Sequence, residues 1–279
     1  MMELTGGMRL AMNRRQLLGI GASVSAAGLA GFTGLAVGYK FRDPIRTAGL
    51  SALGMPPQPP TREDQFKVQR DRIKELHRMQ TKEDVQALKA KYESPILGKF
   101  RVWELIEKLS LCIDPSDGLL GATSQYFHVC QIVRAMEQDG VLDEAMLLAA
   151  VLHDLGKVAM LAGEAPENVV CFTEPIEERE PESGLDNVVF QFGHDEIAYS
   201  RIKDHVPPHV AWMVRYHSMN VGKAEKYMSP QDREFANQYL ARFSKYDLGT
   251  KSKYSLPSEM NLDRHRDFIE SHFPNPILF

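Results

Sequence analysis

Histidine and aspartate side chains recur where the surrounding sequence predicts the apolar face of a helix. His128, for example, precedes Ile132 and Met136 by four and eight residues, so it points toward the interior of the fold. The same spacing recurs around three further positions, and another histidine lies in a Gly-His-Asp-Glu stretch. The inward-facing candidates are His128, His153, Asp154, His194, His217 and Asp247.

Imidazole and carboxylate groups gathered in a protein interior are donors that suit iron, manganese and similar borderline-hard metals. Asp154 directly follows His153 and could bridge two ions, an arrangement that activates water or oxygen. Asp247 shows no cationic partner on its own helical face, so a metal or an ion pair is needed to compensate its charge. Each histidine taken singly is also explained as a hydrogen-bonded core residue. Their recurrence at separate places favours a metal centre.

Helical patterns carry these residues, and the sequence shows no strand-rich region and no internal repeat. The segment 163–184 is predicted as a loop, because it contains three prolines and a run of glutamates. Ser229, Pro230 and Asp232 predict a capped helix start. We therefore predict an all-α helical bundle around a di-metal centre, with helices at 64–79, 82–92, 100–111, 124–138, 143–155, 186–205, 208–217 and from 229 onward.

The first residues have the pattern of a targeting segment rather than of a folded domain. Arg14 and Arg15 precede an uncharged stretch, 16–39, that is rich in glycine, alanine, leucine and valine. We predict a twin-arginine signal or membrane anchor over 1–40, a proline-rich linker over 41–63 and the folded domain over 64–279. The protein is then exported or membrane-anchored; a buried Gly/Ala helix in a cytoplasmic protein is the alternative.

The overall composition excludes several classes of function. The net charge is −4, so we expect no nucleic-acid partner. Cys112, Cys130 and Cys171 show no C-x-x-C spacing, which disfavours a structural zinc site and a disulfide framework.

The pattern His128…His153-Asp154…Asp247 resembles that of the HD-domain metalloproteins. Four longer stretches resemble the myo-inositol oxygenase family more specifically, and with Met79-Gln-Thr81 and the Trp103–Asp117 region upstream the resemblance covers about residues 64 to 279. The four stretches are Gly184-Leu-Asp-Asn-Val188, Gly193-His-Asp-Glu196, Val214-Arg-Tyr-His-Ser218 and Phe243-Ser-Lys-Tyr-Asp-Leu-Gly-Thr-Lys-Ser252.

The resemblance implies an HD-type, mixed-valent di-iron oxygenase, an oxidoreductase of inositol catabolism that uses O2 to cleave a ring C–C bond of a polyol. The product is a uronic acid, D-glucuronate in the case of myo-inositol. The metal ligands would be the histidines and aspartates named above, with Asp154 as the bridge. Lys157 and Asp154 would have catalytic roles, and the residues matching the family's substrate-binding positions are Asp114, Ser116, Lys157, Ser218 and Lys251.

Lys157 also has a simpler explanation, since it follows Gly156 where a cation suits the end of a helix. At another position the chain departs from the family: a substrate-binding Gly-Asp pair aligns with Cys171-Phe172. Phe172 in place of an acid predicts a less polar pocket wall and a related hydroxylated substrate.

An HD-type phosphohydrolase and a non-catalytic binding module remain as alternatives. The phosphohydrolase would need several cations for phosphate, and Lys157, Arg215 and Lys251 are the candidates. We expect a monomer.

Overall fold

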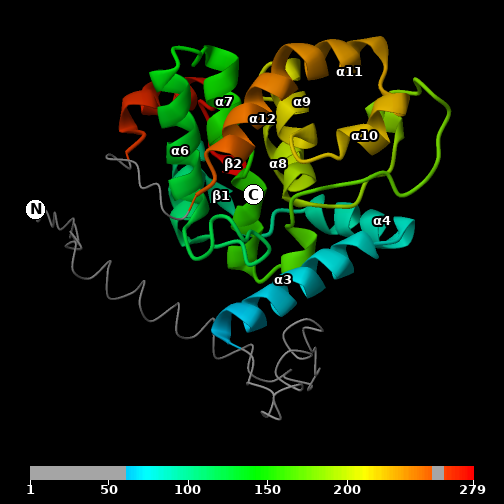
Figure 1. The fold of residues 1–279 in the computed structure, drawn as a ribbon. Helices are drawn as coiled ribbons and strands as arrows, with labels where there is room; N and C mark the ends of the chain where they lie inside the picture. The colour runs from blue at the N-terminus through cyan, green and yellow to red at the C-terminus, as the bar shows by residue number, and fades with distance from the viewer. Residues whose placement is uncertain (1–60, 253–260) are drawn as a thin grey trace, which may run out of the picture. The chain divides into compact units, whose positions relative to one another are not determined.

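The computed structural model describes residues 61–252 and 261–279. The predicted signal or anchor (1–40) and residues 41–60 of the predicted linker lie outside the described residues. Helices dominate the described part, which confirms the all-α prediction (Figure 1). The α-helices are α3 (Arg62–Arg78), α4 (Lys82–Tyr92), α5 (Val102–Lys108), α6 (Gln125–Gln138), α7 (Glu144–Leu152), α8 (His194–Ile202), α9 (Pro208–Tyr216), α10 (Val221–Ala224), α11 (Pro230–Phe235), α12 (Ala241–Gly249) and α13 (Arg266–His272).

Shorter elements connect these helices. The 3₁₀ turns are η2 (Leu109–Leu111), η3 (Leu155–Ala162), η4 (Pro166–Asn168), η5 (Leu185–Asn187), η6 (Glu225–Tyr227) and η8 (Asp263–His265), and η7 (Ala236–Leu240) is a π-helical turn. The sequence patterns did not reveal β1 (Lys99–Phe100) and β2 (Ile277–Leu278), a short antiparallel pair. Each is two residues long, too short for an alternating pattern to show.

Side-chain caps define where several helices begin. Ser124 and Asp143 cap α6 and α7 by accepting a backbone N–H of the first turn, and Ser229 forms the predicted capping box with Asp232 at α11. Such caps satisfy backbone donors that have no partner inside the helix, each stabilising by about 1 kcal/mol. Two of these caps fix the start of helices that hold candidate ligands, α6 and α7.

The helix α7 lies at the centre of the core, and every side chain from Met146 to Leu152 is buried. It packs against α6, α9 and α12, while α8 packs against α9 and η3 (Figure 1). Within the described residues, Glu144–Ala162 is long and apolar enough to cross a membrane, but 78% of its most apolar window is buried inside the protein. Its composition is therefore explained by its place in the core.

Two predicted helix boundaries are wrong. The predicted helix at 186–205 begins only at His194, because the preceding residues pair with another segment instead of coiling. Ile176 N–H donates to Val189 O at 2.8 Å, and Gln191 N–H donates to Glu174 O at 3.1 Å. The predicted helix at 143–155 is α-helical only to Leu152.

Candidate metal centre

The candidate ligands come from the ends of four helices and from α12. His128 lies in the first turn of α6, and His194 is the first residue of α8. His153 and His217 directly follow the last residues of α7 and α9, and Asp247 lies within α12. All the predicted ligands are buried, with exposed fractions of 0–8%: His128, His153, Asp154, His194, His217 and Asp247.

The ends of α7 and α9 orient their histidines in the same way. His153 Nδ1 donates to Ala150 O at 3.0 Å, and His217 Nδ1 donates to Val214 O at 2.8 Å. Each bond reaches three residues back, to a carbonyl in the last turn, where helix carbonyls lack intrahelical partners. With the proton on Nδ1, the Nε2 lone pair of each neutral ring is directed away from its helix.

The ring of His194 has the same tautomer, because its Nδ1 donates to Val170 O at 3.3 Å. Its Nε2 lies 3.1 Å from Asp154 Oδ1 and 3.2 Å from His217 Nε2. His153 Nε2 lies 3.4 Å from Asp154 Oδ2. Three imidazole lone pairs therefore converge on one carboxylate.

Lone pairs that face one another and a carboxylate repel unless a cation lies between them. His153 Nε2 and Asp154 Oδ1 are buried and accept no hydrogen bond. Metal-binding histidines usually donate their other ring N–H to a carbonyl or carboxylate, as these three do. Three groups have ligand atoms within 4.8 Å of one another: His128, His153 and Asp247; His153, Asp154 and His217; and Asp154, Cys171 and His194. The residues present therefore fit a metal centre.

His128 approaches the centre from the side of Asp247. Its Nε2 lies 2.9 Å from Asp247 Oδ1, and its buried Nδ1 has no hydrogen-bond partner. Asp247 Oδ1 is also 3.9 Å from His153 Nε2. His128 and Asp247 thus extend the cluster at the end opposite His194.

Burial and neighbouring charges favour the protonation states that metal ligands need. Burial holds the pKa of His217 well below its usual value, and His153 and His194 lower it further. Burial alone would raise the pKa of Asp154, but Lys157 and His153 outweigh it and hold the pKa well below its usual range. At neutral pH the ring of His217 is uncharged and Asp154 is ionised, as metal binding requires.

The side chain of Lys157 is completely buried beside this cluster. Its Nζ lies 3.1 Å from both Asp154 Oδ1 and Asp114 Oδ2, and donates to Gln125 Oε1 at 3.0 Å. Burial lowers the pKa of the ammonium, but the carboxylates, Asp154 foremost, raise it well above its usual value. A place near a helix end does not account for Lys157, because its ammonium is buried between two carboxylates.

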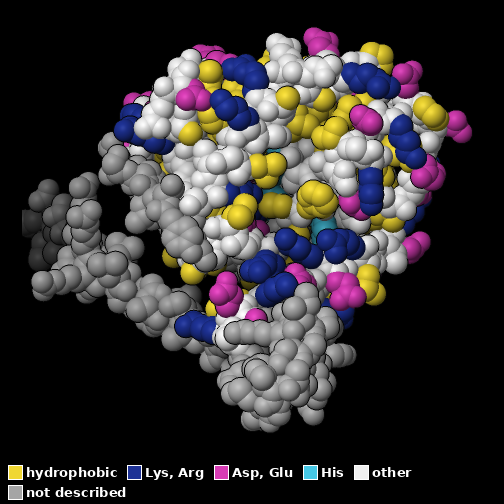
Figure 2. Space-filling view, in the orientation of Figure 1, with side chains coloured by type: hydrophobic (Ala, Val, Ile, Leu, Met, Phe, Trp, Pro, Cys, Tyr) yellow, Lys and Arg dark blue, Asp and Glu magenta, His cyan; other side chains and the backbone are white. Residues whose placement is uncertain are grey.

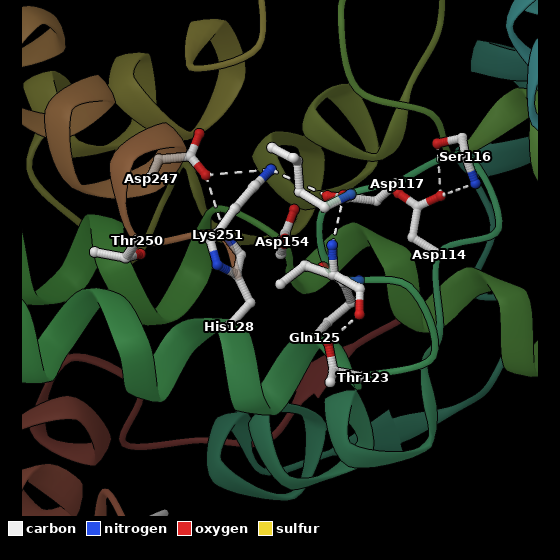
Figure 3. A network of polar contacts seen from close by, with 12 residues as sticks. Asp114, Ser116, Asp117, Thr123, Gln125, His128, Asp154, Asp247, Thr250 and Lys251 are labelled. Carbon is white, nitrogen blue, oxygen red and sulfur yellow. Dashed lines mark hydrogen bonds and ion pairs between the residues drawn. The ribbon is translucent and has the colours of Figure 1, made fainter. Parts of the chain in front are cut away.

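A second buried lysine lies near Asp247. Lys251 Nζ is 3.4 Å from Asp247 Oδ1 and 3.5 Å from Asp117 Oδ2, between the two carboxylates in Figure 3. The statement that Asp247 lacks a cationic partner on its own face is therefore wrong, because Lys251 follows it by one turn. Lys251 and Lys157 place two ammonium groups beside the candidate ligands.

The remaining predicted substrate contacts have partners within the protein. Ser116 donates from both its backbone N–H and its hydroxyl to Asp114 Oδ1, at 2.8 and 2.6 Å. Ser218, next to His217, donates its hydroxyl to Asp195 Oδ2 at 2.7 Å. The structure brings Asp114 into contact with Lys157, while Ser218 lies on the α8 side of the centre.

Two glycines allow the backbone to approach closely behind His194. A Cβ on Gly156 would lie 1.8 Å from His194 O, and a Cβ on Gly193 would lie 2.8 Å from Val170 O. No side chain larger than hydrogen fits at Gly156 unless α8 moves. Neither close approach could be predicted from the sequence, because a contact between distant segments leaves no local pattern.

Sequence reasoning also missed Gln125, Asp117 and the position of Cys171. Gln125 has no exposed surface and is the first residue of α6. Its position three residues before His128 is the only feature of the sequence that points to it. Burial raises the pKa of the Cys171 thiol to about 12. Phe172, by contrast, has a positive φ of 85° and is 56% exposed. The prediction of a pocket wall made less polar by Phe172 is not supported, since more than half of this side chain faces solvent.

The fold and the cluster define an all-helical protein with a buried centre of histidine and aspartate that fits metal. In the space-filling view only small patches of histidine show between the other side chains (Figure 2). A family model described as myo-inositol oxygenase matches residues 67–177 and 170–279. The chain belongs to the myo-inositol oxygenase family, and it is therefore a metal-dependent oxygenase.

Curated relatives match over most of their length. Inositol oxygenase 1 of Arabidopsis thaliana is 29% identical over 248 residues, covering 74% of this chain and 79% of that protein. Inositol oxygenase of Bos taurus is 27% identical, covering 65% of this chain and 76% of that protein. Inositol oxygenase of Homo sapiens is 26% identical, covering 70% and 79%.

Proposed function

We propose that this protein uses O2 to cleave a ring C–C bond of myo-inositol or a closely related cyclitol, giving a uronic acid. For myo-inositol, one O2 is consumed and D-glucuronate, one water and one proton are formed. The substrate loses four electrons and O2 gains four, so no external reductant enters the balance. Family membership and the inositol oxygenase relatives support this activity.

The observation that carries the proposal is the convergence of three Nε2 lone pairs on Asp154. Two iron ions would supply one-electron chemistry with O2 at this place. His128, His153 and Asp247 are placed to hold one ion, His194 and His217 the other, and Asp154 to bridge them. A mixed Fe(II)/Fe(III) pair is part of the proposal.

The two buried lysines would act on the substrate rather than on the ions. A Lys157 ammonium that remains charged can donate a hydrogen bond to a substrate hydroxyl and favour its ionised form. Asp114, Ser116, Ser218 and Lys251 line the same region and supply donors and acceptors for the remaining hydroxyls. In this proposal Lys157 is catalytic, and the others position a neutral polyol.

The contacts of the basic residues argue against an HD-type phosphohydrolase. Arg215 is bound by Glu196, with Nε 2.7 Å from Oε2, and Asp186 also contacts it. Lys157 and Lys251 are each held between two carboxylates. All three candidate cations already have anionic partners, so a phosphate would compete with them.

Oxygen uptake by the iron-loaded protein tests the proposal. Cyclitols, sugars and hydroxyphosphonates are supplied in turn while O2 consumption and uronic acid formation are recorded. We expect uptake with myo-inositol or another cyclitol, with one uronic acid formed per O2. Release of phosphate from phosphomonoesters without O2 uptake would contradict the proposal and establish the phosphohydrolase.

We also propose that residues 1–40 direct the protein out of the cytoplasm or anchor it to the membrane, because Arg14 and Arg15 precede a long uncharged stretch. A fusion of residues 1–60 to a reporter that requires export of a folded protein tests this. Replacing both arginines by lysine should retain the reporter inside. A reporter that stays cytoplasmic behind the native segment would favour a cytoplasmic enzyme.

The expected monomeric state stays a prediction, to be tested by light scattering.

A further inference from the structure

Cys171 lies in a short segment, 170–173, next to the metal centre. Hydrogen bonds hold this segment both before and after Cys171. Before it, Val170 O accepts the Nδ1–H of His194 at 3.3 Å. After it, Thr173 N–H donates to Ser218 O at 3.1 Å, and Thr173 O accepts the N–H of Asn220 at 2.9 Å. The segment is therefore tied to the first residue of α8 and to the residues that follow His217.

The thiol of Cys171 lies close to the ligand atoms of two candidate metal ligands. Its Sγ, a carboxylate oxygen of Asp154 and a ring nitrogen of His194 all lie within 4.8 Å of one another. Metal–sulfur and metal–nitrogen bonds of about 2.3 and 2.1 Å allow two ligands of one ion to lie up to about 4.4 Å apart. The three donor atoms are therefore close enough together to be candidate ligands of one ion.

A second observation indicates that an ion belongs at this point. Asp154 Oδ1 is buried and accepts no hydrogen bond, although His194 Nε2 lies only 3.1 Å away. The bond from His194 Nδ1 to Val170 O occupies Nδ1, so Nε2 is the ring nitrogen that faces Asp154. The cysteine is thus accompanied by a buried carboxylate oxygen that accepts no hydrogen bond and has only ion-pair contacts, with Lys157 and His194.

We propose that Cys171 Sγ is a ligand of the metal ion held by Asp154 and His194, an inference that rests on the proposed di-metal centre. On binding, the S–H bond breaks, a metal–sulfur bond forms and one proton leaves to solvent; no electron is transferred. The ligands at the two positions then differ in kind. The ion at His128 and Asp247 has only nitrogen and oxygen donors, whereas the other also has a soft sulfur donor.

A sulfur ligand also restricts how a substrate can bind. It occupies a coordination position on the ion nearest Ser218 and the 170–173 segment, so fewer positions remain there for hydroxyl groups. Substrates that require two free positions on that ion would bind less well than those that require one.

Cobalt(II) spectroscopy tests the ligand directly and without turnover. The metal-free protein is reloaded with Co(II), and its near-ultraviolet absorption is recorded together with the number of ions bound. We expect two Co(II) per chain and an intense thiolate-to-cobalt charge-transfer band. Cys171→Gly should lose the band and bind one of the two ions at least tenfold more weakly, and Cys171→Ser should lose the band with a smaller loss of affinity.

Cys130→Ala is the matched control, because Cys130 is a buried thiol of α6 outside the three metal-binding groups. It should keep the band. Two bound Co(II) ions without the band in the unaltered protein, or a band that survives in both Cys171 variants, would overturn the Cys171 assignment and leave the metal centre standing. Failure to bind Co(II) would overturn both.

Discussion

The histidines that follow α7 and α9 and Cys171 of the 170–173 segment lie at the same centre but are held differently. His153 and His217 are oriented by carbonyls only three residues away, in the last turn of their own helices. Cys171 is positioned by bonds from its neighbours to His194, Ser218 and Asn220, all more than 20 residues distant in sequence. A hydrogen bond to a carbonyl of its own helix keeps a histidine in place as long as that helix forms. The histidine ligands can therefore keep their positions while the sequence of the 170–173 segment changes.

The largest effect should come from the carboxylate on which the rings converge. We expect Asp154→Ala to lower turnover by at least about 1,000-fold and to reduce bound iron from two ions to at most one, because the bridge is lost. Metal analysis of the purified protein measures this. Asp143→Ala, which removes the cap of α7 and an exposed ion pair with Arg242, should cost about 1 kcal/mol of stability and leave iron bound. Two ions retained in Asp154→Ala would disprove the bridge.

Iron binding and turnover should be almost as sensitive to a substitution of Gly156, which lies against the backbone of His194. Gly156→Ala places a methyl group 1.8 Å from His194 O, so α8 must move and carry its ligand away. We expect loss of one ion and a fall in turnover of about 100-fold, since misplacement by about 1 Å can have that effect. Gly222→Ala is the control, because its nearest neighbour is 3.6 Å away. Equal iron content in both variants would show that η3 and α8 adjust freely.

Lys157→Met separates substrate chemistry from metal binding. We expect turnover per iron-loaded chain to fall by more than about 100-fold, or about 2.7 kcal/mol. The free energy of unfolding should also fall by about 3–5 kcal/mol, because two buried carboxylates lose their cation. Steady-state kinetics and urea unfolding measure the two effects. Lys245→Met, at a lysine whose side chain is 66% exposed, should change neither. Near-normal turnover in Lys157→Met would leave this lysine a structural role only.

The smallest effect is expected from a substitution in the 170–173 segment, at Phe172. Phe172 has a φ of 85°, which costs a bulky residue about 1–3 kcal/mol, and more than half of its side chain is exposed. Phe172→Gly should therefore raise the free energy of unfolding of the metal-free protein by about 1 kcal/mol, after the larger chain entropy of glycine is subtracted. Urea unfolding measures it. A clear loss of stability would show that the phenyl ring contributes packing that outweighs its strain.

The helices and the inward histidines could be predicted because both depend on local spacing. His128 and its apolar neighbours at four and eight residues give the buried face of α6 directly. The start of α8 could not be predicted, because residues 189–191 pair with residues 174–176, which lie earlier in the chain beyond an irregular segment. The close approach at Gly156 and the position of Cys171 near Asp154 depend on distances across the fold, which periodicity does not encode.

The directions of the helices around the centre have an electrostatic consequence. The N-terminal ends of α6 and α8 carry His128 and His194, while the C-terminal ends of α7 and α9 precede His153 and His217. Each helix end bears a partial charge of about half an elementary charge, positive at the N-terminus and negative at the C-terminus. Two ends of each sign largely cancel, so these four helices together contribute little net field. The charge of bound cations must then be balanced by carboxylates, which makes the centre dependent on Asp154 and Asp247.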